Sequence, residues 1–287
     1  MSQPHAYHVV VNALEARAGW KPVSRFASVV THVINGHLPY ERYHAAGIAR
    51  RRDGMTEGMV GRVVSEWLNE DANPGRQILS SLTNAGNAVA AFNAYLQAAP
   101  LGVRSTLSIT AKSAHSQRLS MQRRLCAVTS DPALCRVAVL AAFEHALDRV
   151  RLNAAKGERT PIRRLSHFAL DMGTSSLASA ELATVFEQEG SIPITQAARH
   201  LGCHQRTLER RLRQEGLTAE AVRQAARLLD ATARLHSSAS LTTVAVESGF
   251  SDLAHMSRAF RLSCGQPPSL LRAAALGIVV PEAVVAP

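Results

Sequence analysis

Arginine side chains gather on two short segments in the last third of the chain, at spacings that suit contact with a polyanion. Arg206 and Arg210 stand four residues apart and so share one face of a helix, and Arg258 occupies the second segment. A guanidinium can donate two parallel hydrogen bonds to guanine O6 and N7, or pair with a phosphate. These residues therefore favour nucleic-acid binding, although plain solvated arginines, or an ion pair at Arg258, remain open.

The two segments belong to a pattern that occurs twice, 48 residues apart. The matched pairs are Thr195 with Thr243, Ala197 with Ala245, Leu208 with Met256, Arg210 with Arg258, and Leu212 with Phe260. Each copy predicts a short helix, a tight turn and a second helix with arginine on its exposed face. That is the plan of a helix-turn-helix, whose second helix enters the major groove of DNA. Two units in tandem predict a sequence-specific DNA binder that regulates transcription.

The residues around the repeat predict an all-α region. Ser179 is the expected cap of a first helix that ends at Gly190, and Gly216 ends the helix that begins near Gln205. Thr218 is the expected cap of a long helix that runs to about His236 and joins the two units.

The first 173 residues predict a mixed domain. Helices are expected at 9–18, 58–68, 76–98 and 132–152, and strands at 102–110, 117–122 and 162–170, the first two strands pairing as a hairpin. The predicted fold is thus an α+β N-terminal domain joined to an all-α C-terminal domain in which a long helix links two helix-turn-helix units. The expected divisions are 1–173 (effector binding and dimerisation), 174–179 (linker), 180–276 (DNA binding) and 277–287 (tail).

The formal charge of +10 suits a polyanion partner, but most of the excess lies outside the repeat. Residues 1–173 contain 21 Lys and Arg against 12 Asp and Glu, whereas residues 174–287 contain 11 against 10. Phosphate binding depends on the charge close to the phosphates. The first repeat has such a local positive charge in Arg206, Arg210, Arg211 and Arg213, with Glu209 among them. The excess in the first part slightly favours an anionic effector.

Other functional classes find little support in the sequence. No signal peptide or membrane span is expected, so we predict a cytoplasmic protein. The four cysteines form no C-x-x-C pair and are interpreted as reduced structural thiols, with a redox switch between Cys126 and Cys135 as the alternative. No metal, cofactor or catalytic motif is expected, so we do not predict an enzyme. An enzyme with an attached DNA-binding module is a remote alternative, which a hyper-reactive Cys126 or Cys135 would support.

The C-terminal region resembles the AraC/XylS family of transcription regulators over nearly all of residues 180–272. The family's first unit reads Ala-x-x-Leu-Gly, then Arg-Thr-Leu-x-Arg-x-Leu and Gly. The matching residues are Ala197, Leu201, Gly202, Arg206, Thr207, Leu208, Arg210, Leu212 and Gly216. Those of the second unit are Gly249, Phe250, Ser251, Ser257, Arg258, Ala259, Phe260, Gly265, Pro268 and Arg272. The run from Arg206 to Gly216 is typical of a subgroup with a non-cupin, arabinose-binding-like N-terminal domain, which residues 79–92 resemble weakly.

The resemblance implies which side chains face DNA. Base contacts are expected from Gln205, Arg206, Glu209 and Arg210 in the first unit and from Leu253, Ala254, Ser257 and Arg258 in the second. Arg211, Arg213, His204, His255 and Arg261 are the expected phosphate contacts. Leu253 and Ala254 can touch a thymine methyl but cannot hydrogen-bond a base edge. The first unit is therefore expected to carry most of the sequence specificity.

Double-stranded DNA is the expected partner, and a regulator of this kind is also expected to act with RNA polymerase. We expect a small-molecule effector for residues 1–173, and residues 133–152 are the candidate surface for a homodimer. Control by a protein partner or by abundance, without a small ligand, is the alternative. A ligand-sized cavity within residues 1–173 would argue against it.

Overall fold

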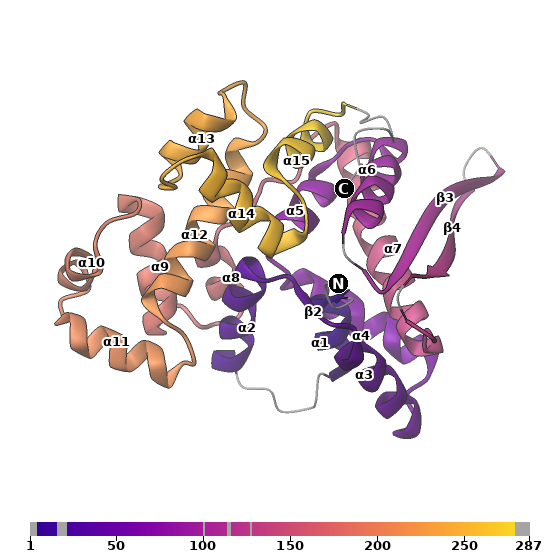
Figure 1. Ribbon diagram of the computed structural model, residues 1–287, viewed down its shortest axis with the longest axis horizontal. Coiled ribbons are helices and arrows are strands. Elements are labelled where there is room, and N and C mark those ends of the chain that lie inside the picture. The colour runs from indigo at the N-terminus through magenta and orange to yellow at the C-terminus, as the bar shows by residue number, and fades with distance from the viewer. Residues whose placement is uncertain (1–4, 16–21, 100, 114–115, 127, 279–287) are drawn as a thin grey trace.

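The computed structural model describes residues 5–15, 22–99, 101–113, 116–126 and 128–278, and it is dominated by helices (Figure 1). The elements of the first part are β1 (His5–Tyr7), α1 (His8–Glu15), α2 (Pro22–Ile34), β2 (His37–Pro39), α3 (Tyr40–Arg52), α4 (Glu57–Asn69), α5 (Pro74–Ser81), α6 (Ala85–Ala98), β3 (Val103–Ser113), β4 (Ser116–Leu125) and α7 (Ala133–Lys156). The second part contains α8 (Leu165–Asp171), α9 (Ala178–Glu189), α10 (Ile194–His200), α11 (Gln205–Gln214), α12 (Ala219–Arg234), α13 (Leu241–Glu247), α14 (Leu253–Cys264) and α15 (Pro268–Ala275). No helix within the described residues is long and apolar enough to cross a membrane.

Two small antiparallel sheets accompany the helices. Strands β3 and β4 form the predicted hairpin, with Leu107 opposite Met121, and it projects from the side of the molecule (Figure 1). Val103, Ser105 and Leu107 are buried while Thr106 is exposed, as expected for a strand with one covered face. The second sheet pairs β1 with β2. This mixture confirms the α+β class expected for the first part, although helices predominate.

Two predictions for secondary structure in and near the first part were wrong. The single helix expected over 76–98 is divided into α5 and α6, because Asn84 caps a new helix by accepting a hydrogen bond from the Asn87 amide at 2.9 Å. The strand expected over 162–170 is instead helix α8. Its buried residues Leu165, Phe168 and Ala169 follow helical spacing, which the short apolar run had concealed.

Helix α9 is capped by a distant carboxylate. Its N-cap is Leu177, and the predicted cap Ser179 is buried without a hydrogen-bond partner for its hydroxyl among the described residues. Glu215, at the end of α11, accepts hydrogen bonds from the amides of Ala178 at 2.7 Å and Ser179 at 2.9 Å. A carboxylate here also interacts favourably with the positive end of the helix dipole. Glu215 therefore ties α11 to α9, the helix that precedes the repeat.

Replacing Glu215 by alanine should lower the free energy of unfolding by about 1–2 kcal/mol, since it removes the partner of two helix-terminal amides. Urea unfolding followed by circular dichroism measures this change. The matched control is Glu189→Ala at the exposed opposite end of the same helix, which should not reduce stability. Equal losses from both substitutions would contradict the capping role.

One hydrophobic core joins the two parts of the chain. Helix α2 contributes Phe26, Val29, Val30 and Val33, which are buried together with residues of α8, α9, α12 and α14. Figure 1 shows α2 beside α8 and α14, apart from α1. Residues 174–177 of the expected linker lie between α8 and α9, and residues 178–179 already belong to α9. Thr174 is buried and bonded to the carbonyl of Ala169. The first part is therefore packed directly on the helices of the repeat.

Candidate nucleic-acid interface

Helix α11 is held against the core by one face, which turns its arginines outward. Leu208 and Leu212 are fully buried, and α10 precedes them across a turn in which Gly202 has a φ of +63°. A residue with a side chain is strained in that left-handed conformation, so glycine suits the turn. Arg206 and Arg210 are both exposed on the other face. The predicted helix-turn-helix geometry of the first repeat is therefore present, with α11 as its second helix.

The exposed face of α11 has two arginines available for a ligand. Within the described residues, neither Arg206 nor Arg210 has an ion-pair partner. Gln205 instead donates to Glu209 at 2.7 Å, and Arg213 lies 3.7 Å from the same carboxylate while remaining largely exposed. The carboxylate of Glu209 is thus taken up by Gln205 and Arg213, so that Arg206 and Arg210 have no acidic partner in the part of the chain that the structure describes.

Arg211 points away from this pair. Its guanidinium donates to Glu181 of α9 at 3.0 Å, and both side chains are about one-third exposed. This bond ties α11 to α9 alongside the contacts of Glu215. To contact a phosphate, the guanidinium of Arg211 must either leave Glu181 or bind both groups at once.

The N-terminal ends of the two candidate recognition helices differ in charge. The N-cap of α11 is His204, an exposed side chain that makes no capping hydrogen bond in the part described. At α14 the N-cap is Asp252, which accepts from the His255 amide at 2.6 Å. That backbone hydrogen bond lowers the pKa of Asp252, so the carboxylate stays ionised at neutral pH. The end of α11 suits a phosphate, whereas the end of α14 already has an anion.

Helix α14 presents a less polar surface than α11. Ala254, Arg258 and Arg261 are exposed, Ser257 is half-buried, and Leu253 packs partly against the core. Arg258 and Arg261 have no ion-pair partner within the described residues. Of these two exposed arginines, Arg258 lies in the middle of α14 and Arg261 in its last turn.

His255 is engaged within its own turn. Its ring lies edge-on to Phe250, with centroids 5.2 Å apart, and its Nδ1 is 3.2 Å from the Ser251 hydroxyl. A phosphate contact from this side chain is limited to Nε2, unless the ring turns.

Hydrogen bonds and ion pairs join the walls of a groove between the two helix pairs, which residues of α9, α12 and α13 line. Arg227 of α12 donates to the Ser191 hydroxyl at 2.8 Å. Asp230 accepts from Arg234 at 2.7 Å and from the Ser248 hydroxyl at 2.8 Å, which connects α12 to the end of α13. These bonds fix the angle at which each pair leaves α12. Arg227 therefore has a structural role in this geometry, as the acidic neighbours Glu220 and Asp230 on its own helix suggest, and Glu220 lies 3.8 Å from its guanidinium.

The cysteines give no support to a nucleophilic site. Each of the four is a free thiol, with Cys126 exposed and Cys135 buried. Burial raises the pKa of Cys135 to about 12, so little thiolate exists at neutral pH. Within the described residues, no cluster of His, Cys, Asp and Glu could hold a metal ion.

Iodoacetamide at about pH 8 should alkylate Cys126 at the rate of an ordinary exposed thiol and leave Cys135 and Cys264 unmodified until the protein unfolds, because burial raises the pKa of both to about 12. Mass spectrometry of timed samples, native and in urea, measures the three rates separately. Rapid native labelling of Cys135 would contradict its burial and support a catalytic thiol.

Comparison with known proteins agrees with the geometry of the repeat. Residues 197–274 match a family model described as a helix-turn-helix domain. They form a helix-turn-helix domain. Such domains bind DNA, so the match points to a DNA-binding regulator of transcription rather than an enzyme.

The other comparisons add little. A crystal structure of the transcriptional regulator CdpR from Pseudomonas aeruginosa matches with 16% identity, over 90% of this chain and 99% of that chain. The TM-score of 0.32 does not establish a shared fold. None of the curated proteins matches the sequence.

Proposed function

We propose that this chain is a transcription regulator of the AraC/XylS type, which binds two neighbouring turns of DNA through two helix-turn-helix units. The observation that carries the proposal is the pair Arg206 and Arg210, exposed and without ion-pair partners in the described chain, on a helix anchored by Leu208 and Leu212. The pair formed by α13 and α14 repeats this plan, with Gly249 at a φ of +81° in its turn. Helix α12, at about 24 Å, separates the units on the scale of one turn of DNA.

The proposed roles follow from exposure and from the partners that each side chain already has. Arg206 and Arg210 are the main base readers, and the bonded pair Gln205 and Glu209 shapes the same surface. In the second unit Arg258 reads a base, while Ala254, Leu253 and Ser257 contribute close packing against the groove. The proposed phosphate contacts are His204, Arg211, Arg213, His255 and Arg261. The first unit supplies most of the specificity, because Arg206 lies in the first turn of α11, Arg210 lies near its middle, and both are unpaired in the described part of the chain. The corresponding end of α14 carries the apolar residues Leu253 and Ala254, and Arg261 lies in its last turn.

The test is selection of bound fragments from genomic DNA by the purified full chain at about 150 mM salt, where non-specific binding is weak. We expect one enriched motif about two helical turns long. Binding without any enriched sequence would contradict base readout, and the positive charge of the first part would then account for attachment to DNA.

An effector-responsive first part is also part of the proposal. A cavity of about 90 Å³ lies within it, lined by residues of β1, α3, α5, α6, β3 and α7. That cavity favours control by a ligand over control by a partner or abundance alone. RNA polymerase remains a proposed partner.

A homodimer through α7 has weaker support. The helix packs against α1, α3, α4, α5 and α6, which cover much of its surface. Its exposed positions between 136 and 149 are charged: Arg136, Glu144, Asp148 and Arg149. Leu152 is the one large exposed apolar residue in the described part of α7. Equilibrium sedimentation of Leu152→Glu and of the unmodified protein measures whether this helix contributes to a dimer.

A further inference from the structure

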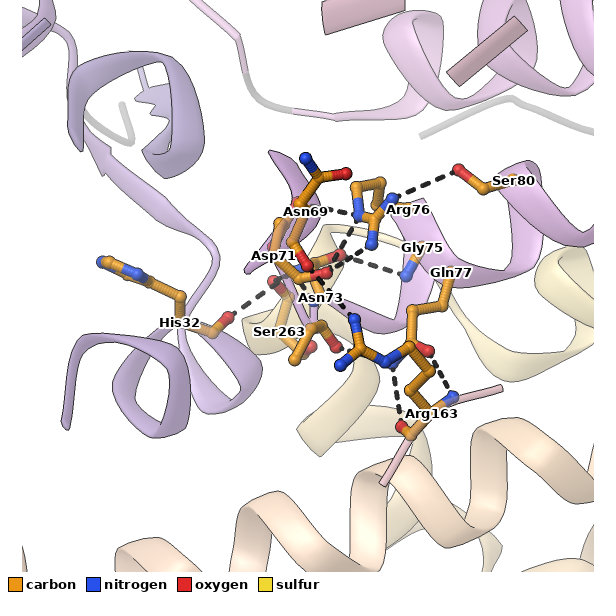
Figure 2. Close-up of polar contacts among 11 residues, drawn as sticks. His32, Asn69, Asp71, Asn73, Gly75, Arg76, Gln77, Ser80, Arg163 and Ser263 are labelled. Atoms are coloured by element: carbon orange, nitrogen blue, oxygen red, sulfur yellow. Dashed lines mark hydrogen bonds and ion pairs between the residues drawn. The ribbon is translucent and has the colours of Figure 1, made fainter. Parts of the chain in front are cut away.

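The C-terminal end of α14 is held by three separate elements of the first part. The side chain of Asn73, before α5, donates to the carbonyl of Ser263 at 2.8 Å (Figure 2). The amide of Gly36, before β2, donates to the carbonyl of Leu262 at 3.4 Å. The carbonyl of Tyr95, in α6, accepts from Gln266 at 3.2 Å. A helix proposed to enter DNA by its first turn is thus anchored by its last turn to the first part.

Asn73 is itself fixed from several sides. Its amide donates to the Asp71 carboxylate at 3.0 Å, and its side-chain oxygen caps α5 by accepting from Gly75 at 3.0 Å. Arg76 donates to the carbonyl of Asp71 at 2.9 Å (Figure 2). Because Asn73 is buried and fully bonded, a shift of the start of α5 must move the Ser263 carbonyl with it or break this bond.

The cavity in the first part shares its wall with this anchor. Asn73, Gly75 and Tyr95 all line it. On the far side Gly75 lies against Cys264 of α14, since a Cβ on this glycine would approach that of Cys264 to 3.2 Å. One thin layer, formed by the start of α5 and the last turn of α6, therefore separates the cavity from the end of α14.

The chemistry of the lining favours an uncharged ligand over the anionic effector that the charge of residues 1–173 suggested. Most of the walls are apolar or aromatic, including Phe92 and Phe143, whose rings meet edge to face. The buried cation Arg123 is already paired with Asp131 through two hydrogen bonds of 2.7 and 2.9 Å and also donates to Ser105 and Tyr43. Arg76, a second cation in the lining, is paired with Asp71 at 3.5 Å. A carboxylate ligand would have to compete with Asp131 or Asp71 in a poorly solvated site, which is costly.

One polar atom at the cavity remains unsatisfied. Nδ1 of His5 is buried and has no hydrogen-bond partner within the described residues. Buried polar groups are nearly always bonded, so this atom suits a hydroxyl or amide of a ligand. The enclosed volume is below the roughly 150 Å³ that holds benzene in an engineered cavity, but the cavity is partly open, so a ring can extend toward solvent.

We propose that this cavity binds a small uncharged molecule with an aromatic or short aliphatic body and one hydrogen-bonding group. Its occupancy moves the start of α5 and the end of α6, and so changes how firmly the first part holds α14 and how well the chain binds DNA. The coupling half of this inference rests on the proposed DNA-binding function, whereas the binding half does not.

The experiment uses the full chain and a set of probes: phenol, benzyl alcohol and cyclohexanol as uncharged molecules and benzoate as the anionic counterpart. Thermal unfolding at increasing probe concentration measures binding, since a ligand of the folded state raises Tm. The blocking variant is Ala142→Leu, which places extra atoms in the cavity from α7. The matched control is Ala154→Leu, at an exposed position of the same helix.

At least one uncharged probe should raise the Tm of the unmodified chain and of Ala154→Leu, and should lose this effect in Ala142→Leu. Three outcomes would contradict ligand binding in the cavity. They are no rise in Tm with any uncharged probe, equal rises in Ala142→Leu and Ala154→Leu, or a larger cavity-dependent rise with benzoate.

Coupling is measured as the dissociation constant for the enriched DNA sequence, with and without the active probe. We expect a change of about fivefold or more, and a smaller one in Asn73→Ala, which lacks the bond to Ser263. Binding of a probe in the cavity without any change in DNA affinity would contradict the proposed coupling between the cavity and α14. A failure to bind any DNA sequence specifically would instead contradict the proposed function and leave the Tm result standing.

Discussion

Replacing Arg210 by alanine should weaken binding to the enriched DNA sequence by about 5- to 150-fold, the range that corresponds to one bidentate contact with guanine. Binding to random duplex should fall much less. Arg210 is exposed on the outer face of α11 and has no ion pair within the described residues, so its removal leaves the fold of the domain intact. Fluorescence anisotropy with both duplexes, at several salt concentrations, measures the two losses.

Arg213→Ala is the matched control on the same helix. Its side chain is 71% exposed and is proposed to contact phosphate, so its loss should weaken both duplexes alike and reduce the salt slope by about one. The difference between the two variants separates base readout from charge. Equal losses on both duplexes for Arg210→Ala would contradict its role as a base reader.

Gly36→Ala should destabilise the folded chain by about 1–3 kcal/mol, by forcing the first part away from α14. A Cβ on Gly36 would lie 2.0 Å from the carbonyl oxygen of Ser263 and 2.5 Å from the side-chain nitrogen of Asn73. The carbonyl oxygen of Ser263 belongs to the backbone of α14 and cannot rotate away as a side chain can, so the contact between the first part and α14 must open. We expect the substitution also to loosen the end of α14, which hydrogen exchange of residues 260–266 would report.

Gly61→Ala in α4 is the matched control for this substitution. A Cβ there meets nothing within 4 Å, and alanine suits a helix interior better than glycine by about 0.5–1 kcal/mol. Urea unfolding should therefore show opposite signs for the two substitutions. An unchanged or raised stability for Gly36→Ala would contradict the close approach of β2 and α14.

The sequence predicted the helices of the DNA-binding region well because their signals are local. Gly202, Gly216 and Gly249 mark turns or helix ends with positive φ, and Thr218 caps α12 by accepting from the Ala221 amide at 3.1 Å, as expected. The sequence contains a comparable signal for helix α2, since Phe26, Val29, Val30 and Val33 recur at helical spacing.

The contacts that join the two parts were beyond sequence reasoning. The bond from Asn73 to Ser263 links positions 190 residues apart, and no local pattern marks either of them. Likewise, Glu215 caps α9 from the end of α11, in place of the predicted local cap Ser179. Such contacts depend on how whole elements pack, which a periodic pattern does not encode.

For the candidate site, the sequence predicted which residues share a face but not which of them are already bonded. The spacing of Arg206 and Arg210 was enough to place both on the outer face of α11. It did not reveal that Arg211 is paired with Glu181, or that Gln205 is bonded to Glu209. These pairings depend on neighbouring rotamers and helices, and they determine which cations are available to DNA.

Guanine methylation interference on the enriched duplex tests the central claim most directly, because a methyl group at N7 blocks readout from the major groove. Two interfering patches should appear about 10–11 base pairs apart on the same face of the duplex, one for α11 and one for α14. Arg210→Ala should abolish interference in only one of them. A single patch, or two patches on opposite faces, would contradict binding by two units across adjacent major grooves.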